Sequence, residues 1–206
     1  MSAALRGLYA LADTELTPGP RLVPAVEAAI RGGARLVQYR DKSRDAARRE
    51  REARGLLELC RGHGVPLIVN DDVELALLLG ADGVHLGKDD ADPATARVRL
   101  GPRTLIGISC YDSLERAVAA AQAGADYVAF GSFFPSGTKP HAARAPAGLL
   151  ADARRRLSIP LCAIGGITPG NGGELVKAGA DMLAVIRGLF GAEDVAAAAK
   201  AYARLF

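Results

Sequence analysis

Short apolar runs and helical patterns alternate along the whole sequence, and this alternation limits the folds that the chain can adopt. A Gly-Ala-Asp triplet lies between a helical pattern and the next apolar run at residues 80–82, 124–126 and 179–181, with a looser version at 32–34. Glycine directly after a helix supplies the left-handed backbone that ends it. Each triplet therefore predicts a return from a helix to a strand.

The apolar runs predict strands that are buried on both faces, because most of the runs are continuous rather than alternating. They span residues 8–11, 36–39, 67–69, 84–86, 105–108, 127–130, 161–164 and 183–186. Strands of this kind are typical of parallel sheets covered by helices. We therefore expect a parallel sheet built from these segments.

Helical patterns separate the predicted strands. They span residues 22–31, 44–61, 73–79, 93–100, 114–123, 147–157, 173–178 and 194–205. Ser113 and Asp194 stand where they can cap two of these helices. Strict βα alternation without a linker favours an α/β protein of the (β/α)8 TIM barrel type, a single domain over residues 1–206, and leaves an open doubly wound sheet as the alternative.

Charge and hydropathy exclude some partners. The formal net charge is +3, and the arginines of residues 44–54 are interspersed with acidic residues, which is typical of a solvated helix face rather than of a nucleic-acid interface. No run of about 18 apolar residues and no signal-peptide pattern occurs, so we expect neither a membrane span nor export. A homo-oligomer stays open.

The cysteines do not indicate a structural role in crosslinking or metal binding. Cys60, Cys110 and Cys162 are odd in number and widely spaced, without a Cys-x-x-Cys pair. Neither a disulfide framework nor a zinc site is expected from this spacing. A reducing, cytoplasmic location fits such a chain best.

Polar residues gather directly after the predicted strands, where barrels of this class carry their sites. After the second strand, alternation places Gln38, Arg40 and Lys42 on one side. Two cations and an amide on one face suit a pyrophosphate. The alternative is a strand that runs into a charged surface turn.

Carboxylates follow the third and fourth strands. Asn70 and Asp71 stand after the third strand, and Asp90 stands after the fourth. Mg²⁺ takes one or two protein carboxylates and completes its shell with water and phosphate oxygens, so Asp71 and Asp90 are the predicted ligands. The alternative is that aspartates here cap the following helices, a role that suits Asp72 and Asp92.

Two further strand residues bear on the site. His85 lies inside the fourth apolar run, where a hydrogen-bonded core histidine is the more common case than a ligand or base. Ser109 follows the fifth strand without a nearby histidine in sequence, so a hydrogen bond to phosphate suits it better than a nucleophilic role.

The last strand ends and one long loop suggest a site for a second phosphate. Residues 131–146 form the longest irregular stretch and contain Ser136, Gly137, Thr138 and Lys139, so we interpret them as a lid. The seventh strand ends at Gly165 and Gly166, and the eighth at Ile186 and Arg187. Loops after strands seven and eight commonly form a backbone phosphate cup, although a Gly-Gly pair also suits an ordinary turn.

Taken in order, these motifs resemble those of the thiamine-phosphate synthases across nearly the whole chain. The resemblance is carried by residues 38–42 (QYRDK), 70–72 (NDD), 80–87 (GADGVHLG), 131–139 (GSFFPSGTK) and 164–167 (IGGI). It implies a (β/α)8 fold and Mg²⁺. It also implies two small-molecule substrates, 4-amino-5-hydroxymethyl-2-methylpyrimidine pyrophosphate and 4-methyl-5-(2-phosphoethyl)thiazole, which yield thiamine phosphate and pyrophosphate.

The resemblance also implies roles for individual residues. Asp71 and Asp90 become the metal ligands. The residues implied to bind the pyrimidine pyrophosphate are Gln38, Arg40, Lys42, Asn70, Ser109 and Lys139, of which Arg40, Lys42, Ser109 and Lys139 are the expected catalytic set. Tyr39 and Asp41 are further expected substrate-binding residues. The residues implied to bind the thiazole phosphate are Ser136, Gly137, Thr138, Gly166, Ile186 and Arg187.

Two residues depart from the commoner family pattern. Lys88 stands where glutamine is frequent, and Arg187 stands where a small polar residue is frequent. Neither change removes a predicted metal ligand, and a backbone N–H contact at Arg187 would tolerate the larger side chain.

Two other functions compete with the synthase. A thiazole tautomerase on the same barrel would need a positioned acid or base, whereas Cys110 follows Ser109 here and the pyrophosphate cations and metal carboxylates are present. A non-catalytic phosphate-binding barrel is the second alternative, since a fold alone does not determine function. The presence of Asp71, Asp90 and Lys139 together argues against it.

Overall fold

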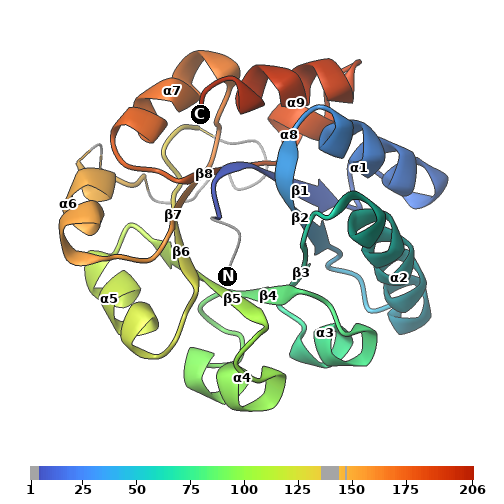
Figure 1. Cartoon of the computed structure of the whole chain (residues 1–206), viewed down its shortest axis with the longest axis horizontal. Helices are drawn as coiled ribbons and strands as arrows, with labels where there is room; N and C mark the ends of the chain where they lie inside the picture. Colours follow the sequence, from blue (N-terminus) through green and yellow to red (C-terminus); the bar gives the residue numbers. More distant parts are fainter. Residues whose placement is uncertain (1–4, 136–143, 147) are drawn as a thin grey trace.

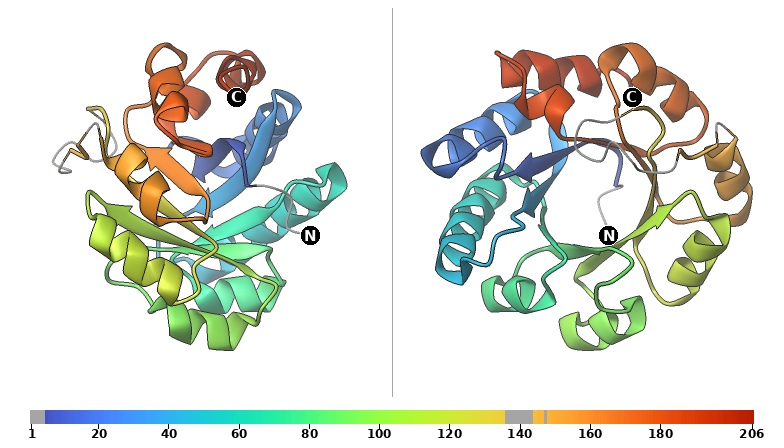
Figure 2. Two further views of the ribbon diagram at one scale, coloured as in Figure 1. Left: turned by 60° about the vertical axis from the view of Figure 1, so that its left-hand side comes forward. Right: turned by 180° about the vertical axis from the view of Figure 1, so that it is seen from behind.

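The computed structural model describes residues 5–135, 144–146 and 148–206. Eight parallel strands form a closed barrel in sequence order, and β1 pairs with β8 to complete the ring. The helices surround the ring in every view (Figures 1 and 2). Closure confirms the predicted TIM barrel and excludes the open doubly wound sheet.

The strands agree with the predicted apolar runs to within a few residues at each end. They are β1 (Gly7–Asp13), β2 (Ala34–Arg40), β3 (Leu67–Asn70), β4 (Gly83–Leu86), β5 (Leu105–Tyr111), β6 (Tyr127–Phe130), β7 (Leu161–Ile164) and β8 (Met182–Val185). The largest extension is at β5, which continues three residues beyond the predicted end at residue 108.

The helices follow each strand as predicted, with two differences. They are α1 (Leu22–Arg31), α2 (Ala46–His63), α3 (Val73–Leu79), α4 (Pro93–Leu100), α5 (Leu114–Gln122), α6 (Leu149–Arg156), α7 (Pro169–Lys177), α8 (Arg187–Phe190) and α9 (Val195–Ala203), and a 3-10 turn spans Gly19–Arg21. α7 begins at Pro169 rather than at residue 173, because a capping box between Thr168 and Asn171 starts a helix that glycines otherwise disfavour. α8 was not predicted, since four residues show no helical period.

The predicted helix caps are confirmed. Ser113 accepts a hydrogen bond from the Arg116 amide, and Asp194 accepts one from the Ala197 amide. The alternative assigned to Asp72 is also observed, because it caps α3 by accepting from the Leu75 amide. Asp72 is therefore the helix cap after β3. This leaves Asp71, its neighbour, available for another role.

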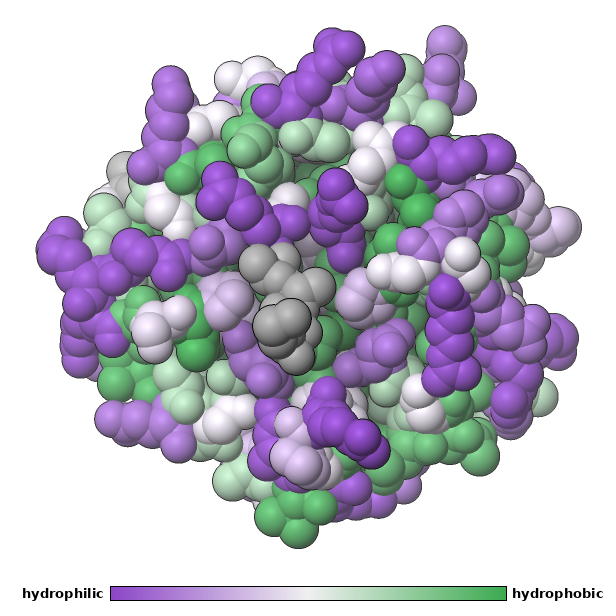
Figure 3. Space-filling model, viewed as in Figure 1, coloured by the Kyte–Doolittle hydropathy of each residue, from purple (hydrophilic) through white to green (hydrophobic). Residues whose placement is uncertain are grey.

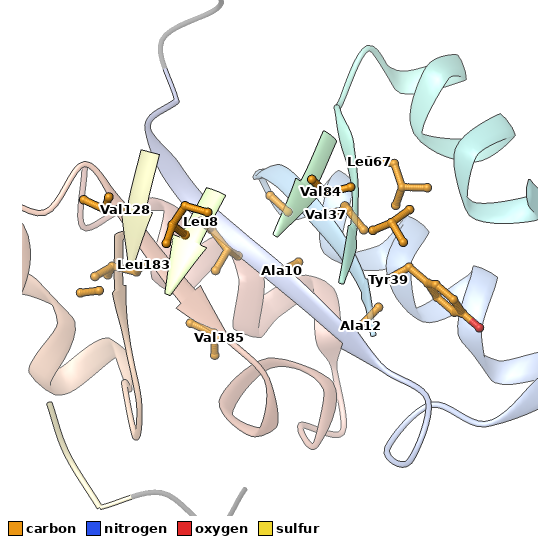
Figure 4. Packing of buried hydrophobic residues seen from close by; sticks show 14 of the residues in the cluster. Leu8, Ala10, Ala12, Val37, Tyr39, Leu67, Val84, Val128, Leu183 and Val185 are labelled. Atoms are coloured by element: carbon orange, nitrogen blue, oxygen red, sulfur yellow. The ribbon is translucent and has the colours of Figure 1, made fainter. Parts of the chain in front are cut away.

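Two layers of buried side chains fill the molecule. One layer lies inside the barrel and includes Tyr9, Tyr127 and Cys162. The other lies between the strands and the helices, where Figure 4 shows Leu8 of β1 and Tyr39 of β2 among its members. Because successive strand residues point to opposite faces, each strand contributes to both layers.

The aspartates of the Gly-Ala-Asp triplets bind the start of the neighbouring strand. Asp82 accepts a hydrogen bond from the Leu67 amide at 2.9 Å, Asp126 from the Ile106 amide at 2.7 Å and Asp181 from the Leu161 amide at 2.8 Å. We call these three contacts the strand clips. The sequence predicted a helix-to-strand return at each triplet, and the structure adds that the carboxylate joins two strands at the N-terminal end of the barrel.

Removing one strand clip should destabilise the barrel. The Asp126 carboxylate accepts from both the Ile106 amide and Arg97, so Asp126→Ala leaves a buried amide and a guanidinium without this partner. We expect a loss of about 1–3 kcal/mol, the usual cost of an unsatisfied buried donor. Thermal unfolding of Asp126→Ala and of Asp152→Ala checks this. The ion pair of Asp152 with Arg155 is exposed, so its loss should leave the melting temperature nearly unchanged.

The outer surface carries the polar side chains of the helices. In Figure 3, hydrophilic residues predominate around the periphery of the visible face, with smaller hydrophobic areas between them. Within residues 5–135, 144–146 and 148–206, the structure contains no helix of sufficient length and apolarity to cross a membrane.

Candidate active site

A cavity of about 160 Å³ lies at the C-terminal ends of the strands. We call it the main pocket. All eight strands contribute to its lining, among them β1 with Tyr9, β3 with Asn70, β4 with His85 and β8 with Ala184. This is the face on which (β/α)8 barrels carry their active sites.

A hydrogen-bonded chain of side chains crosses the barrel at this pocket. Gln38 donates through Nε2 to the Tyr9 hydroxyl at 2.7 Å, and the hydroxyls of Tyr9 and Tyr127 lie 2.9 Å apart. The Tyr127 hydroxyl lies 3.0 Å from His85 Nδ1, and His85 Nε2 lies 2.9 Å from Ser109 Oγ. We call these five residues the floor chain.

The two phenols of the floor chain stay neutral. Burial raises the pKa of Tyr9 and that of Tyr127 well above the ordinary value for tyrosine. Their hydroxyls therefore act only as hydrogen-bond donors and acceptors. The expectation that His85 is a hydrogen-bonded interior residue is confirmed, although it also lines the main pocket.

The residues of the motif at 38–42 divide between two sides of β2. Gln38 and Arg40 line the main pocket. The Tyr39 hydroxyl instead donates to Glu52 of α2 at 2.9 Å, and Asp41 is held by Arg48 of the same helix at 2.6 Å. The structure thus brings Gln38 and Arg40 to the pocket but places the side chains of Tyr39 and Asp41 in the layer under α2.

The two cations of this motif are each paired with a carboxylate. Arg40 forms an ion pair with Asp13, whose side chain is almost fully buried at the end of β1. Lys42 lies at the rim, where it is half-exposed and forms an ion pair with Asp71. Because Asp13 orients the guanidinium, Arg40 is held in place at the edge of the pocket.

Asp71 and Asp90 come together from neighbouring strand ends. Their carboxyl groups are hydrogen-bonded to each other, and Asp90 also accepts from the Gly87 amide at 2.6 Å. Burial alone raises the pKa of Asp71, but the hydrogen bonds of its carboxylate with Lys42 and Asp90 hold that pKa below its ordinary value. Burial and the neighbouring Asp71 carboxylate hold the pKa of Asp90 above its ordinary value.

The backbone at the site is strained at two positions. Asp71 has φ of 63° and Tyr111 has φ of 55°, and these are the non-glycine residues with positive φ in the part of the chain that the structure describes. Left-handed backbone is costly for residues other than glycine and occurs preferentially at functional sites. Tyr111 lines the main pocket, so both strained residues belong to the same end of the barrel.

A second cavity adjoins the first between the ends of β7 and β8. It is lined by Gly165, Gly166, Thr168, Ile186 and Arg187, among others. We call it the glycine cup. A side-chain carbon on Gly166 would lie only 2.3 Å from the Pro135 carbonyl oxygen, so the loops approach each other more closely than any other residue allows.

The long loop predicted as a lid is described only at its two ends. The Ala145 amide donates to the Ser132 carbonyl at 3.0 Å, which brings the two ends together beside β7. The predicted contacts Ser136, Gly137, Thr138 and Lys139 lie outside the described residues. Their roles stay predictions.

The thiols near the site are not reactive groups. Cys110, the neighbour of Ser109, is buried on the helix side of β5, and burial raises its pKa to about 12. Cys162 lines the main pocket, and burial raises its pKa as well. Since the thiolate is the reactive form, neither thiol serves as an acid, base or nucleophile near neutral pH.

Tyr9, Asp13 and Tyr127 contribute polar groups to the site and were not predicted from the sequence. Tyr9 and Tyr127 stand in continuous apolar runs that do not distinguish inside from outside. Gly107 was an available signal, because a glycine within a strand marks a close approach, and a side-chain carbon there would lie 2.0 Å from the Tyr127 ring.

These features define a class of protein, the (β/α)8-barrel enzymes that bind phosphorylated small molecules at the C-terminal rim. A family model described as thiamine monophosphate synthase matches residues 8–189 of the chain. The chain therefore belongs to that family.

Known thiamine-phosphate synthases are similar to the chain over nearly its full length. Thiamine-phosphate synthases from Nitrosococcus oceani and Chromobacterium violaceum are 54% and 58% identical to the chain over 206 residues, which cover 100% of this chain and 95% and 99% of theirs. The solved structure of thiamine phosphate pyrophosphorylase from Pyrococcus furiosus has a TM-score of 0.89 at 35% identity, covering 98% of this chain and 95% of that chain.

Proposed function

We propose that the chain condenses 4-amino-5-hydroxymethyl-2-methylpyrimidine pyrophosphate with 4-methyl-5-(2-phosphoethyl)thiazole to give thiamine phosphate and pyrophosphate. The observation that carries the proposal is the pair of adjoining cavities. The main pocket and the glycine cup share Ile164, Gly165, Ala184 and Ile186 as a common wall. Two substrates that react with each other need adjacent sites that hold the reacting atoms in contact.

The main pocket suits the pyrimidine ring. Its walls include the apolar residues Leu11, Ala129 and Ile164, and its polar groups are concentrated on the floor chain. A flat heteroaromatic ring binds best between apolar walls with a few polar groups that fix its orientation. Gln38 and Ser109 are the two floor-chain ends that meet this ligand.

The pyrophosphate would extend from the ring towards the rim. Arg40 and Asn70 line this side of the main pocket, and Lys42 lies beyond them beside Asp71. Guanidinium and ammonium groups form charge-assisted hydrogen bonds with phosphate oxygens. The catalytic residues of the proposal are Arg40, Lys42 and Ser109, together with Lys139.

The residues present fit a magnesium ion. Asp71 and Asp90 offer two carboxylates in contact, with one ammonium, that of Lys42, in an ion pair with Asp71. The described part of the chain has no cluster of three or more histidine, cysteine or acidic residues that could hold a metal by itself. Mg²⁺ typically uses one or two carboxylates and completes its shell with water and phosphate oxygens. When bound there, it would neutralise charge on the pyrophosphate oxygens.

The proposed reaction is a dissociative substitution. The bond between the pyrimidine methylene carbon and the pyrophosphate oxygen breaks, and its electron pair leaves with pyrophosphate. The thiazole nitrogen then donates its lone pair to the methylene carbon and has no proton to lose. No protein base is needed, so Arg40 and Lys42 act by stabilising the departing anion and the pocket walls act by holding the two rings together.

The thiazole phosphate would occupy the glycine cup. Gly165 and Gly166 both have positive φ, with values of 104° and 62°, which turns the loop after β7 back towards the cup. Glycine backbone permits the close approach of amide groups to a phosphate. Arg187 is exposed at the edge of the cup and adds a positive charge there.

The proposal is tested by pyrophosphate release from the purified protein. We expect release only when both substrates and Mg²⁺ are present, with thiamine phosphate formed in equal amount. Absence of release under these conditions would overturn the proposal. Isomerisation of the thiazole alone would instead identify a tautomerase, and tight binding without turnover would identify a phosphate-binding barrel.

We also propose that the reaction takes place in the cytoplasm. Cys60, Cys110 and Cys162 are free and buried in the structure. Unpaired thiols are typical of proteins that work in a reducing compartment.

A further inference from the structure

Tyr127 occupies a central place in the floor chain although it does not line the main pocket. Its side chain is fully buried in the barrel, and its hydroxyl lies between the hydroxyl of Tyr9 and Nδ1 of His85. Both of those neighbours line the pocket. The Tyr127 hydroxyl therefore holds Tyr9 and His85 from the barrel interior, on the side opposite to the main pocket.

The space for Tyr127 is provided by its partner in the next strand. Gly107 of β5 pairs with Tyr127 of β6, and a side-chain carbon on Gly107 would lie 2.0 Å from the Tyr127 ring. The rings of Tyr127 and His85 stack with centroids 5.6 Å apart. The phenol ring is thus fixed in the barrel interior, where its hydroxyl is costly unless it is hydrogen-bonded.

We assign the hydrogen-bond donors of the floor chain in the direction from Gln38 to Ser109. Gln38 donates an amide hydrogen to Tyr9, and each hydroxyl has only one hydrogen to give. A buried Tyr9 hydrogen is satisfied when it is directed to Tyr127, and the Tyr127 hydrogen is then directed to His85 Nδ1. In this order, His85 carries its own proton on Nε2, from which it donates to Ser109.

This order determines what the two ends of the chain offer to a ligand. Gln38 uses one of its two amide N–H groups on Tyr9, which orients the side chain so that its carbonyl oxygen is an acceptor for a ligand. Ser109 Oγ receives a hydrogen from His85, which leaves its own O–H as a donor. One end of the floor chain therefore accepts and the other donates.

We propose that Tyr127 is a positioning residue that fixes the tautomer of His85 and, through it, makes Ser109 a hydrogen-bond donor into the main pocket. The inference rests on the proposed function in one respect: an aminopyrimidine pyrophosphate has an N–H donor for Gln38 and phosphate or ring acceptors for Ser109. Tyr127 acts through its hydroxyl and does not touch the substrate.

Removal of the Tyr127 hydroxyl tests this role. Tyr127→Phe keeps the ring and its packing, and it deprives His85 Nδ1 of its donor. We expect KM for the pyrimidine pyrophosphate to rise about five- to tenfold, the cost of one net hydrogen bond. We expect KM for the thiazole phosphate to stay within about twofold, because the glycine cup is not altered. We expect any fall in kcat to be no larger than about the same five- to tenfold factor, because Ser109 keeps its hydroxyl and loses only its fixed orientation.

Tyr202→Phe is the matched control. Tyr202 is also a fully buried tyrosine, and its hydroxyl donates to the Ile167 carbonyl at 2.9 Å outside the floor chain. Tyr202→Phe also loses one phenol hydrogen bond, so its melting temperature should fall about as much as that of Tyr127→Phe. Its KM for the pyrimidine pyrophosphate should not change. Equal KM values in wild type and Tyr127→Phe would overturn the proposal.

The tautomer of His85 gives a second test that needs no substrate and no variant of Tyr127. Nitrogen-15 NMR of the wild-type protein near pH 8 distinguishes the two neutral tautomers, and loss of a signal in His85→Gln assigns it. A proton on Nε2 supports the proposal, and a proton on Nδ1 contradicts it. Wild-type protein that shows no turnover but carries the Nε2 tautomer would overturn the proposed function and leave the floor-chain direction intact.

Discussion

Asp71→Asn should lower kcat/KM by roughly 10²–10³-fold, the scale expected when a principal electrostatic stabiliser of the leaving group is removed. The substitution exchanges one of the two carboxylates proposed to hold Mg²⁺ for a neutral amide. Asparagine is the best replacement here, because the residue has φ of 63° and asparagine tolerates left-handed backbone better than most residues.

Stability should change much less than activity in this variant. Asp71 lies against Asp90, and the Asp71 carboxylate disfavours ionisation of Asp90, whose pKa is raised. The amide removes that conflict, although it also weakens the ion pair with Lys42, which is half-exposed and contributes little. We expect a melting temperature without Mg²⁺ within about 3 °C of wild type. Steady-state kinetics over a range of Mg²⁺ concentrations, with thermal unfolding, measures both quantities.

Asp72→Asn provides the control, since it makes the same chemical change one residue later. Asp72 caps α3 and pairs with Arg49 rather than facing Asp90. Asparagine is an equally good helix cap. Its kcat/KM should stay within about twofold of wild type. If both variants lost activity equally, or if Asp71→Asn kept more than about a third of it, the proposed metal role of Asp71 would be wrong.

Gly166→Ala should reduce kcat/KM for the thiazole phosphate by about 10²-fold, because a displacement of about 1 Å at a reacting group has this cost. The new carbon would lie 2.3 Å from the Pro135 carbonyl oxygen and 2.8 Å from the Phe134 side chain. The loops after β6 and β7 would then have to separate, and the glycine cup would change shape. KM for the pyrimidine pyrophosphate should change little.

The control for this variant is Gly64→Ala, which isolates the cost of the backbone conformation. Gly64 ends α2 with φ of 66°, close to the 62° of Gly166, and a carbon added there meets nothing within 4 Å. Alanine should therefore cost roughly 1–2 kcal/mol of stability at Gly64, and at Gly166 the cost of separating the loops adds to the same backbone cost. Only Gly166→Ala should alter the kinetics, and similar kinetics for the two variants would contradict a phosphate site in the glycine cup.

The strand ends were predictable from the sequence, because parallel strands bring their C-terminal residues to one rim. Asn70, Asp71 and Asp90 were placed at this rim from their position after apolar runs, and the structure has them there. Alternation along β2 correctly placed Gln38 and Arg40 on the pocket side. The same rule, applied to Tyr39 and Asp41, would have directed their side chains towards α2, where the structure places them.

The floor chain was not predictable, because its contacts depend on how the barrel closes. The two tyrosines that meet in it are 118 residues apart, and each lies in a run that is apolar throughout. Barrel closure determines which of their neighbours face inward. The ion pair of Asp13 with Arg40 has the same origin, since it joins β1 to β2 at a position that neither strand reveals alone.

The acidic residues at the two rims of the barrel have different environments, because the strand clips lie at the N-terminal rim. At the N-terminal rim, the Asp82, Asp126 and Asp181 carboxylates accept hydrogen bonds from backbone amides of the neighbouring strand. At the C-terminal rim, the carboxyl groups of Asp71 and Asp90 are in contact with each other. We therefore expect substitutions at the N-terminal rim to change heat tolerance without changing turnover, and substitutions of Asp71 or Asp90 to change turnover far more than heat tolerance.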